Sequence, residues 1–151
     1  MRWAEEAGCA ESAAALAARP GLGEAFVELH GPLGAGKTTF VRHLLQSLGI
    51  EGRVKSPTYT LMEPYRADEA HGSFEIAHFD FYRFDDPSEW EDAGFRDVFA
   101  GGGLKLVEWP EKAEGLLPRC DLRLEIRPDD EGTGRDVRFE ALTPHGEALL
   151  P

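Results

Sequence analysis

The strongest chemical signal in the sequence is the run Gly31-Pro32-Leu33-Gly34-Ala35-Gly36-Lys37-Thr38, which fits the pattern G-x-x-x-x-G-K-[ST] at every defined position. Glycines in such a run let the backbone curl until its N–H groups point at phosphate oxygens. A helix that begins near Lys37 would aim the positive end of its dipole at the same anion. Lys37 would then reach the β- and γ-phosphates, and the Thr38 hydroxyl would join a magnesium shell. The run therefore predicts a site for a nucleoside triphosphate with Mg²⁺.

Two acids at the ends of apolar runs are candidates for the chemistry beside that loop. Glu108 closes the run Leu104–Val107, where a Walker B acid is expected, and Asp80 closes the run Phe74–Phe79. One acid would hold the metal and the other would position the attacking water. Residue types alone do not assign the two roles, and each acid could also be a surface group at a strand end.

Two further side chains are candidates for nucleotide contact. Thr58 follows Ser56-Pro57, between the loop's helix and the next extended run. Nucleotide-hydrolysing proteins often place a threonine that senses the γ-phosphate in such a segment. The alternative is a proline-containing turn that starts a strand. Trp109 could stack on a base, and the alternative for it is a place in the core.

The loop needs a strand before it and a helix after it, and the sequence predicts both. The apolar run at 25–29 indicates a buried strand. After the loop, apolar residues recur at helical spacing and Gly49 provides a stop; they are Phe40, Val41, Leu44, Leu45 and Leu48.

The other predicted elements suit one mixed α/β domain over residues 1–151, with a central sheet flanked by helices. They are a helix over 12–18, antiparallel strands over 59–65 and 74–80, a helix with Asp86 as its cap and Pro87 in its first turn, a strand over 104–107, and a hairpin of 122–126 with 137–141 joined through the turn 129–134.

Composition narrows the classes of function. The chain carries 28 acidic and 16 basic residues, a net charge of −12, so direct and unaided binding of nucleic acid is disfavoured. No apolar run approaches the roughly 18–20 residues that cross a bilayer. The acidic start Met1–Glu6 is unlike a signal peptide, so we expect a cytoplasmic protein without membrane contact. The two cysteines and five histidines show no metal-ligand spacing.

Taken together, the motifs resemble the bacterial TsaE family, the ATPase of tRNA threonylcarbamoyladenosine biosynthesis. The resemblance runs from Ser12 to about Pro118. It rests on four motifs in the family's order and spacing: L-G-A-G-K-T-T-F (Leu33–Phe40), S-P-T-Y-T-L (Ser56–Leu61), H-F-D-F-Y-R (His78–Arg83) and V-E-W-P-E (Val107–Glu111).

The resemblance implies a small single-domain P-loop fold that binds ATP and Mg²⁺ and hydrolyses ATP weakly by itself. It implies two partners, the threonylcarbamoyl-transferase subunit TsaD and its inactive paralogue TsaB. Together they would modify the adenosine 3′ of the anticodon, with the ATP cycle supporting repeated turnover. The acidic composition indicates that those partners hold most of the tRNA.

The resemblance also assigns roles to single residues. Magnesium ligands fall on Thr38 and Glu108, the aspartate linked to hydrolysis on Asp80, and the switch-like threonine on Thr58. Lys37, Asp80 and Glu108 form the catalytic set. Ser12 matches a hydroxyl residue at the start of the first helix near the nucleotide, a place where it could also cap the helix. The nucleotide-binding set is Ser12, Leu33, Gly34, Ala35, Gly36, Lys37, Thr38, Thr39, Thr58, Asp80 and Trp109.

The chain also departs from the family. Pro32 replaces a usual aspartate, although the loop backbone needs no side chain there, and residues after Arg119 carry no family motif.

Three other classes of protein are alternatives to this resemblance. A small-molecule kinase would need an arginine-bearing lid, and Arg123 and Arg127 instead lie on a predicted strand and look solvent-facing. A nucleotide-gated protein-binding module would bind ATP without needing to hydrolyse it. A GTPase is disfavoured, because the D-x-x-G match Asp129–Gly132 falls in the hairpin turn with little chain beyond it.

Overall fold

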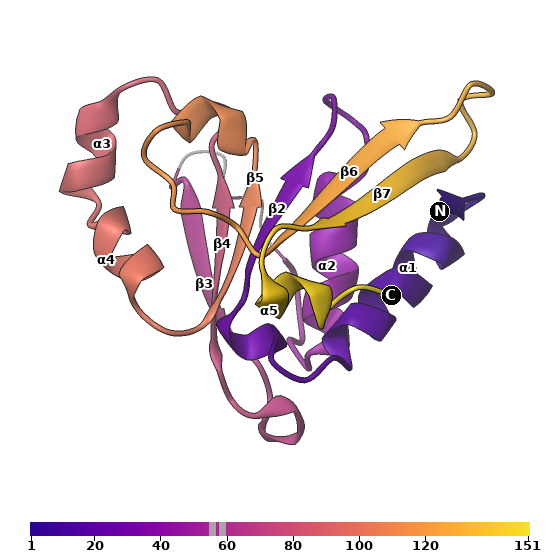
Figure 1. Ribbon diagram of the computed structural model, residues 1–151, viewed down its shortest axis with the longest axis horizontal. Helices are drawn as coiled ribbons and strands as arrows, with labels where there is room; N and C mark the ends of the chain where they lie inside the picture. The colour runs from indigo at the N-terminus through magenta and orange to yellow at the C-terminus, as the bar shows by residue number, and fades with distance from the viewer. Residues whose placement is uncertain (55–56, 58–59) are drawn as a thin grey trace.

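The computed structural model describes residues 1–54, 57 and 60–151, and it is an α/β protein built on a seven-stranded mixed sheet (Figure 1). The strand order is β1-β7-β6-β2-β5-β4-β3. Strands β6, β2, β5 and β4 run parallel, and the outer pairs β1–β7, β7–β6 and β4–β3 are antiparallel. The strands are β1 Arg2–Trp3, β2 Phe26–His30, β3 Met62–Arg66, β4 Glu75–Asp80, β5 Leu104–Glu108, β6 Leu122–Pro128 and β7 Arg135–Ala141.

Helices cover the sheet from both sides, as predicted. Figure 1 shows α1 beside α2, with α3 and α4 at the opposite side of the molecule. The helices are α1 Glu6–Ala17, α2 Lys37–Ser47, α3 Pro87–Asp92, α4 Phe95–Ala100 and α5 Pro144–Glu147, with 3₁₀ turns at Leu22–Glu24, Glu69–His71 and Pro110–Ala113.

Two hydrophobic clusters form the core, one on each face of the sheet. The first joins α1 and α2 to residues such as Leu29, Leu106 and Leu124. The second is rich in aromatic rings and lies under α3 and α4; Phe79, for example, packs on Phe95 with ring centroids 5.1 Å apart. Alternate residues of one strand therefore enter different clusters, as the two-residue period of a strand requires.

The local predictions around the loop are confirmed. Helix α2 begins at Lys37, directly after Gly36, and ends at Ser47, with Gly49 beyond it at φ 90°. Strands β3 and β4 are antiparallel neighbours. Asp86 caps α3 by accepting a hydrogen bond from the Ser88 N–H, at 2.9 Å.

The first helix differs from its prediction, because α1 begins at Glu6 and Ser12 lies in its middle. The prediction that Ser12 starts or caps this helix was therefore wrong. Glutamate and alanine upstream of Ser12 favour helix, and Glu6 in the first turn suits the helix dipole. Ser12 Oγ instead accepts a hydrogen bond from Trp3 Nε1 at 2.9 Å.

The hairpin of β6 and β7 was predicted correctly, although its strands are longer than expected. Its outward-facing residues pair in register as Arg123 with Glu140, Glu125 with Arg138, and Arg127 with Asp136. The side chains of Arg123 and Arg127 are 40% and 64% exposed. The two arginines are therefore strand residues that face solvent, as predicted.

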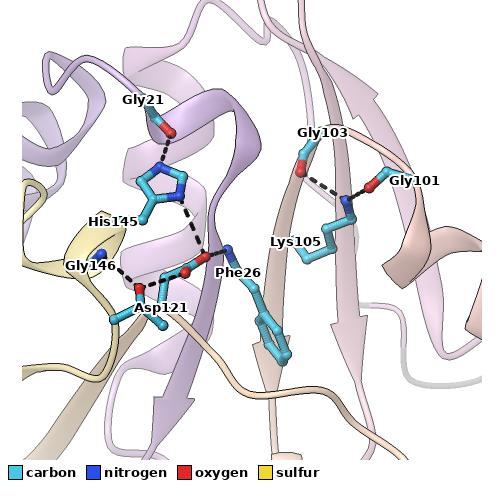
Figure 2. A network of polar contacts seen from close by, with 9 residues as sticks. Gly21, Phe26, Gly101, Gly103, Lys105, Asp121, His145 and Gly146 are labelled. Atoms are coloured by element: carbon cyan, nitrogen blue, oxygen red, sulfur yellow. Dashed lines mark hydrogen bonds and ion pairs between the residues drawn. The ribbon is translucent and has the colours of Figure 1, made fainter.

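Two polar networks fix the amino-terminal ends of the parallel strands (Figure 2). The Asp121 carboxylate accepts hydrogen bonds from the Phe26 N–H at 2.8 Å and from the Thr143 hydroxyl at 2.7 Å. On β5, the buried Lys105 Nζ donates to the carbonyl oxygens of Gly101 and Gly103. These anchors lie at the end of the sheet opposite the phosphate loop. They therefore do not occupy the carboxyl ends of the strands, where the candidate site lies.

Candidate functional site

The candidate site is a cavity of about 620 Å³ at the carboxyl ends of the parallel strands. The phosphate loop follows β2, Asp80 ends β4 and Glu108 ends β5, and the last two are paired in register. In open α/β sheets, ligands bind at the carboxyl ends of the strands. The lining residues are Leu33, Gly34, Ala35, Gly36, Lys37, Thr38, Thr39, Asp80, Tyr82, Arg83, Glu108 and Trp109.

The loop backbone is shaped by its glycines. Gly31 and Gly36 have φ values of 147° and 108°, in the region that residues with a side chain rarely adopt. A Cβ atom on Gly31 would lie 2.1 Å from the carbonyl oxygen of Ile126, so β6 leaves no room for a side chain there. Pro32 fits, and its carbonyl oxygen accepts a hydrogen bond from the Ala35 N–H at 3.1 Å.

The Lys37 ammonium group lies between the loop and an aromatic ring. Its Nζ donates to the Gly31 carbonyl oxygen at 2.5 Å and lies 3.6 Å from the centroid of the Trp109 ring. Burial lowers the pKa of Lys37, while the negative charges of Glu108, Glu111 and Asp80 oppose that shift. The lysine thus has one carbonyl and one ring as partners, both of which a phosphate group could replace.

Thr38 and Glu108 offer two hard oxygen atoms at one point. The Thr38 hydroxyl donates to Glu108 Oε1 at 2.8 Å, and Glu108 Oε2 lies 2.6 Å from His78 Nε2. Within residues 1–54, 57 and 60–151 there is no group of three or more His, Cys, Asp or Glu residues that could hold a metal ion. A hydroxyl with a single carboxylate is the kind of set that binds Mg²⁺ together with substrate phosphates, so these residues fit that ion.

Asp80 is a buried carboxylate beside Glu108. Its Oδ1 accepts a hydrogen bond from the Tyr82 N–H at 3.0 Å. Burial raises the pKa of Asp80, and the negative charge of Glu108 raises it further, although the Tyr82 hydrogen bond opposes the shift. Asp80 is therefore a stronger base than an exposed aspartate, which suits a group that orients a water molecule.

Trp109 forms one wall of the cavity. Its backbone is left-handed, with φ 56°, and its half-buried ring packs against the second hydrophobic cluster and lies 4.9 Å from the Tyr82 ring. A non-glycine residue in this conformation carries strain that the surrounding structure has to offset. The ring covers Lys37, whereas stacking on a base stays a prediction.

Of the predicted site residues that the structure describes, Ser12 alone does not line this cavity. Thr58 lies outside the described residues. Ser12 supports Trp3, which lines a second cavity of about 230 Å³ together with Ala35, Gly36 and Thr39 of the loop region. Any role of Ser12 near a nucleotide would therefore be through that second cavity.

Sequence reasoning missed two residues that shape the site. His78 bonds Glu108; it lies two residues before Asp80, so strand alternation could have placed both on one face. Arg135, on β7, reaches the loop: its Nε donates to the Ala35 carbonyl oxygen at 2.7 Å, and its Nη2 lies 3.5 Å from that of Gly34. No local pattern links residues a hundred positions apart.

This fold, with its glycine-rich loop between β2 and α2, defines the chain as an α/β protein of the P-loop class. The family model "Threonylcarbamoyl adenosine biosynthesis protein TsaE" matches residues 3–137. The chain belongs to the TsaE family.

Relatives and a solved structure agree with that assignment. The tRNA threonylcarbamoyladenosine biosynthesis protein TsaE of Haemophilus influenzae is 44% identical over 82% of this chain and 75% of its own length. The protein of the same name from Bacillus subtilis is 40% identical over 80% and 72%. The crystal structure of Bacillus subtilis YdiB is 28% identical and has a TM-score of 0.75, covering 99% of this chain and 88% of that one.

The helices give no sign of a membrane span. Across the described ranges, none is long and apolar enough to cross a bilayer.

Proposed function

We propose that this chain binds ATP with Mg²⁺ in the 620 Å³ cavity and hydrolyses it slowly, as an accessory ATPase in the biosynthesis of threonylcarbamoyladenosine in tRNA. The observation that carries the proposal is the convergence of the phosphate loop with Asp80 and Glu108 on one cavity. The names of the relatives point to the pathway.

The loop and Lys37 would hold the triphosphate. Backbone N–H groups of the loop would bind phosphate oxygens, and the start of α2 would add its positive dipole end. Lys37 Nζ would give up the Gly31 carbonyl oxygen and bind the β- and γ-phosphates. Because its present partners are neutral, this exchange would replace a hydrogen bond to a neutral carbonyl by one between two charged groups.

Thr38 and Glu108 would hold the magnesium ion, with phosphate oxygens and water completing its shell. Mg²⁺, when bound, would neutralise charge on the β- and γ-phosphate oxygens. The Thr38 hydroxyl would then turn its oxygen toward the metal instead of donating to Glu108 alone.

Asp80 would orient the attacking water and accept its proton. The water oxygen would bond to the γ-phosphorus as the bridging bond to the β-phosphate breaks, giving ADP and phosphate. Burial makes Asp80 a stronger base than usual, which supports this assignment. The nucleoside would extend toward the 230 Å³ cavity, because that cavity shares Ala35, Gly36 and Thr39 with the phosphate site. Trp109 does not line that cavity, so its ring would cover the phosphate end at Lys37 and would not stack on the base.

We propose that the chain works in the cytoplasm with TsaD and TsaB, and that tRNA contacts mainly those two partners. The net charge of −12 supports this division, because the chain alone has too little positive charge to grip a phosphate backbone. Weak hydrolysis in isolation would suit an ATPase that is completed by its partners.

The test is the ATPase rate of the purified chain with and without the two partner proteins. We expect the rate to rise when both are added, and an unchanged rate would count against the assignment. Glu108→Ala separates hydrolysis from binding. If this variant keeps partner binding but stops turnover in the tRNA modification assay, then ATP does more than gate binding. Full modification by the variant would favour a nucleotide-gated binding module.

A further inference from the structure

His78 is a fully buried histidine on β4, the strand that lies between β5 and β3. Its side chain has no exposed surface, and it does not line the 620 Å³ cavity. Nε2 lies 2.6 Å from Glu108 Oε2, and Nδ1 is buried without a hydrogen-bond partner in the part of the chain that the structure describes. Within the described residues, the imidazole therefore makes its hydrogen bond to Glu108.

The sheet brings His78 and Glu108 together on the face that packs against α2. His78 is in register with Leu106, and Asp80 is in register with Glu108. Leu106 belongs to the cluster that includes α2, so strand alternation puts His78 and Glu108 on that same face. Thr38, the second residue of α2, approaches Glu108 from above this face.

The Glu108 carboxylate is thereby held from two sides. One oxygen accepts from the Thr38 hydroxyl at 2.8 Å and the other faces His78 at 2.6 Å. A glutamate has three side-chain torsions, so a carboxylate held at only one oxygen can rotate away from the direction that a metal needs. An ionised carboxylate only accepts hydrogen bonds, so the contact with His78 requires the hydrogen to be on Nε2.

We infer that His78 is a positioning residue, which fixes the Glu108 carboxylate for Mg²⁺ without touching the metal or the nucleotide. The inference rests on the proposed function, because it takes Glu108 as a magnesium ligand. Hydrogen-bond partners that orient metal ligands typically change metal affinity by 10–100-fold when they are removed. His78 differs from such a partner in ordinary zinc sites because here the imidazole orients and the carboxylate binds.

The test compares two amides that differ in reach. His78→Gln can place its side-chain N–H near the position of Nε2, whereas His78→Asn keeps an amide but is too short to reach Glu108. Each purified full-length variant is titrated with MgCl₂ in the presence of a non-hydrolysable ATP analogue, with binding measured by calorimetry. Affinity for the same analogue is also measured in EDTA.

We expect His78→Asn to raise the Mg²⁺ concentration that half-maximally strengthens binding of the analogue by about 10–100-fold. Its affinity for the analogue in EDTA should stay within about twofold, since the phosphate loop is unchanged, and His78→Gln should recover most of the Mg²⁺ response. His30→Leu is the matched control. It removes another imidazole–glutamate contact, from His30 Nε2 to Glu28 Oε1 at 2.9 Å, and alternation puts it on the opposite face of the sheet.

A second comparison keeps the inference testable if the single variants lose stability. In a Glu108→Gln background, His78→Asn should cause no further loss of Mg²⁺ response, because His78 acts through the carboxylate. A wild-type Mg²⁺ response in His78→Asn, or an equal loss in EDTA, would overturn the inference. If the wild-type chain shows no Mg²⁺-dependent binding of the analogue, the proposed function itself fails.

Discussion

Replacing Arg135 by methionine removes the guanidinium group that joins β7 to the phosphate loop, while keeping most of the apolar stem. The Nε contact to the Ala35 carbonyl oxygen, at 2.7 Å, is the one that matters, because the Nη2 contact to Gly34 is at the 3.5 Å limit. Hydrogen bonds to charged groups contribute about 1.5–3 kcal/mol. Arg135 is partly exposed, so solvent screening lowers our figure to about 1 kcal/mol.

That free energy has two expected consequences. The free energy of unfolding should fall by about 1 kcal/mol, measured by urea denaturation. If losing these contacts lets the loop leave its binding conformation in the free protein, the same free energy opposes nucleotide binding. A loss of about 1 kcal/mol raises the Kd about fivefold. Calorimetry with ADP measures it.

Two matched variants complete the experiment. Arg135→Lys can keep one hydrogen bond to the loop and should lie between methionine and wild type. Arg138→Met removes an arginine of the same strand that is 76% exposed and should change neither quantity. Wild-type unfolding and wild-type ADP affinity in Arg135→Met would refute the idea that these carbonyl contacts hold the loop.

Two other substitutions test the loop and Asp80. Gly31→Ala should unfold the chain or destabilise it by several kcal/mol, because its Cβ would lie 2.1 Å from the Ile126 carbonyl oxygen. Gly34→Ala has open space around its Cβ but a φ of 78°, so it should lower the free energy of unfolding by only about 1–2 kcal/mol. Circular dichroism melts would compare the two, and equal losses would contradict the steric argument. Because burial raises the pKa of Asp80, the folded state binds this proton more tightly than the unfolded state, and the ionised carboxylate lowers stability at pH 7. Asp80→Asn can still accept a hydrogen bond from the Tyr82 N–H and should have a higher melting temperature than wild type at pH 7. This difference in melting temperature should shrink as the pH falls through the raised pKa of Asp80. A lower melting temperature of the variant at pH 7 would contradict the argument.

The parts of the site that sequence predicted are those set by local rules. Helix α2 follows from apolar spacing, and the loop follows from glycines whose positive φ values a side chain would oppose. Asp80 and Glu108 were expected at strand ends, and parallel pairing in register brings them together. What sequence left open was which acid approaches Thr38, and the structure pairs Thr38 with Glu108.

The parts that sequence missed depend on contacts between distant segments. Arg135 reaches the loop only because β7 pairs with β6 and β6 lies beside β2. The start of α1 was misplaced because Gly8 and Cys9 have low helix propensity, whereas tertiary packing, in which Cys9 is buried and Gly8 lies against Trp3, extends the helix back to Glu6. No short-range spacing links His78 to Glu108, because the two residues are thirty positions apart.

The charge pairs on the β6–β7 hairpin add little stability one by one, since exposed ion pairs contribute at most about 1 kcal/mol each. The order of the charges along the two strands matters more than the stability that any one pair contributes. A slip of two residues is the smallest that keeps the apolar side chains on the core face. Such a slip would set Arg123 against Arg138 in one direction, or Glu125 against Glu140 in the other. It would also carry Arg135 about 6–7 Å along the strand, away from the loop. The alternating charges thus disfavour a misregistered hairpin, in which Arg135 would no longer reach the phosphate loop of the candidate site.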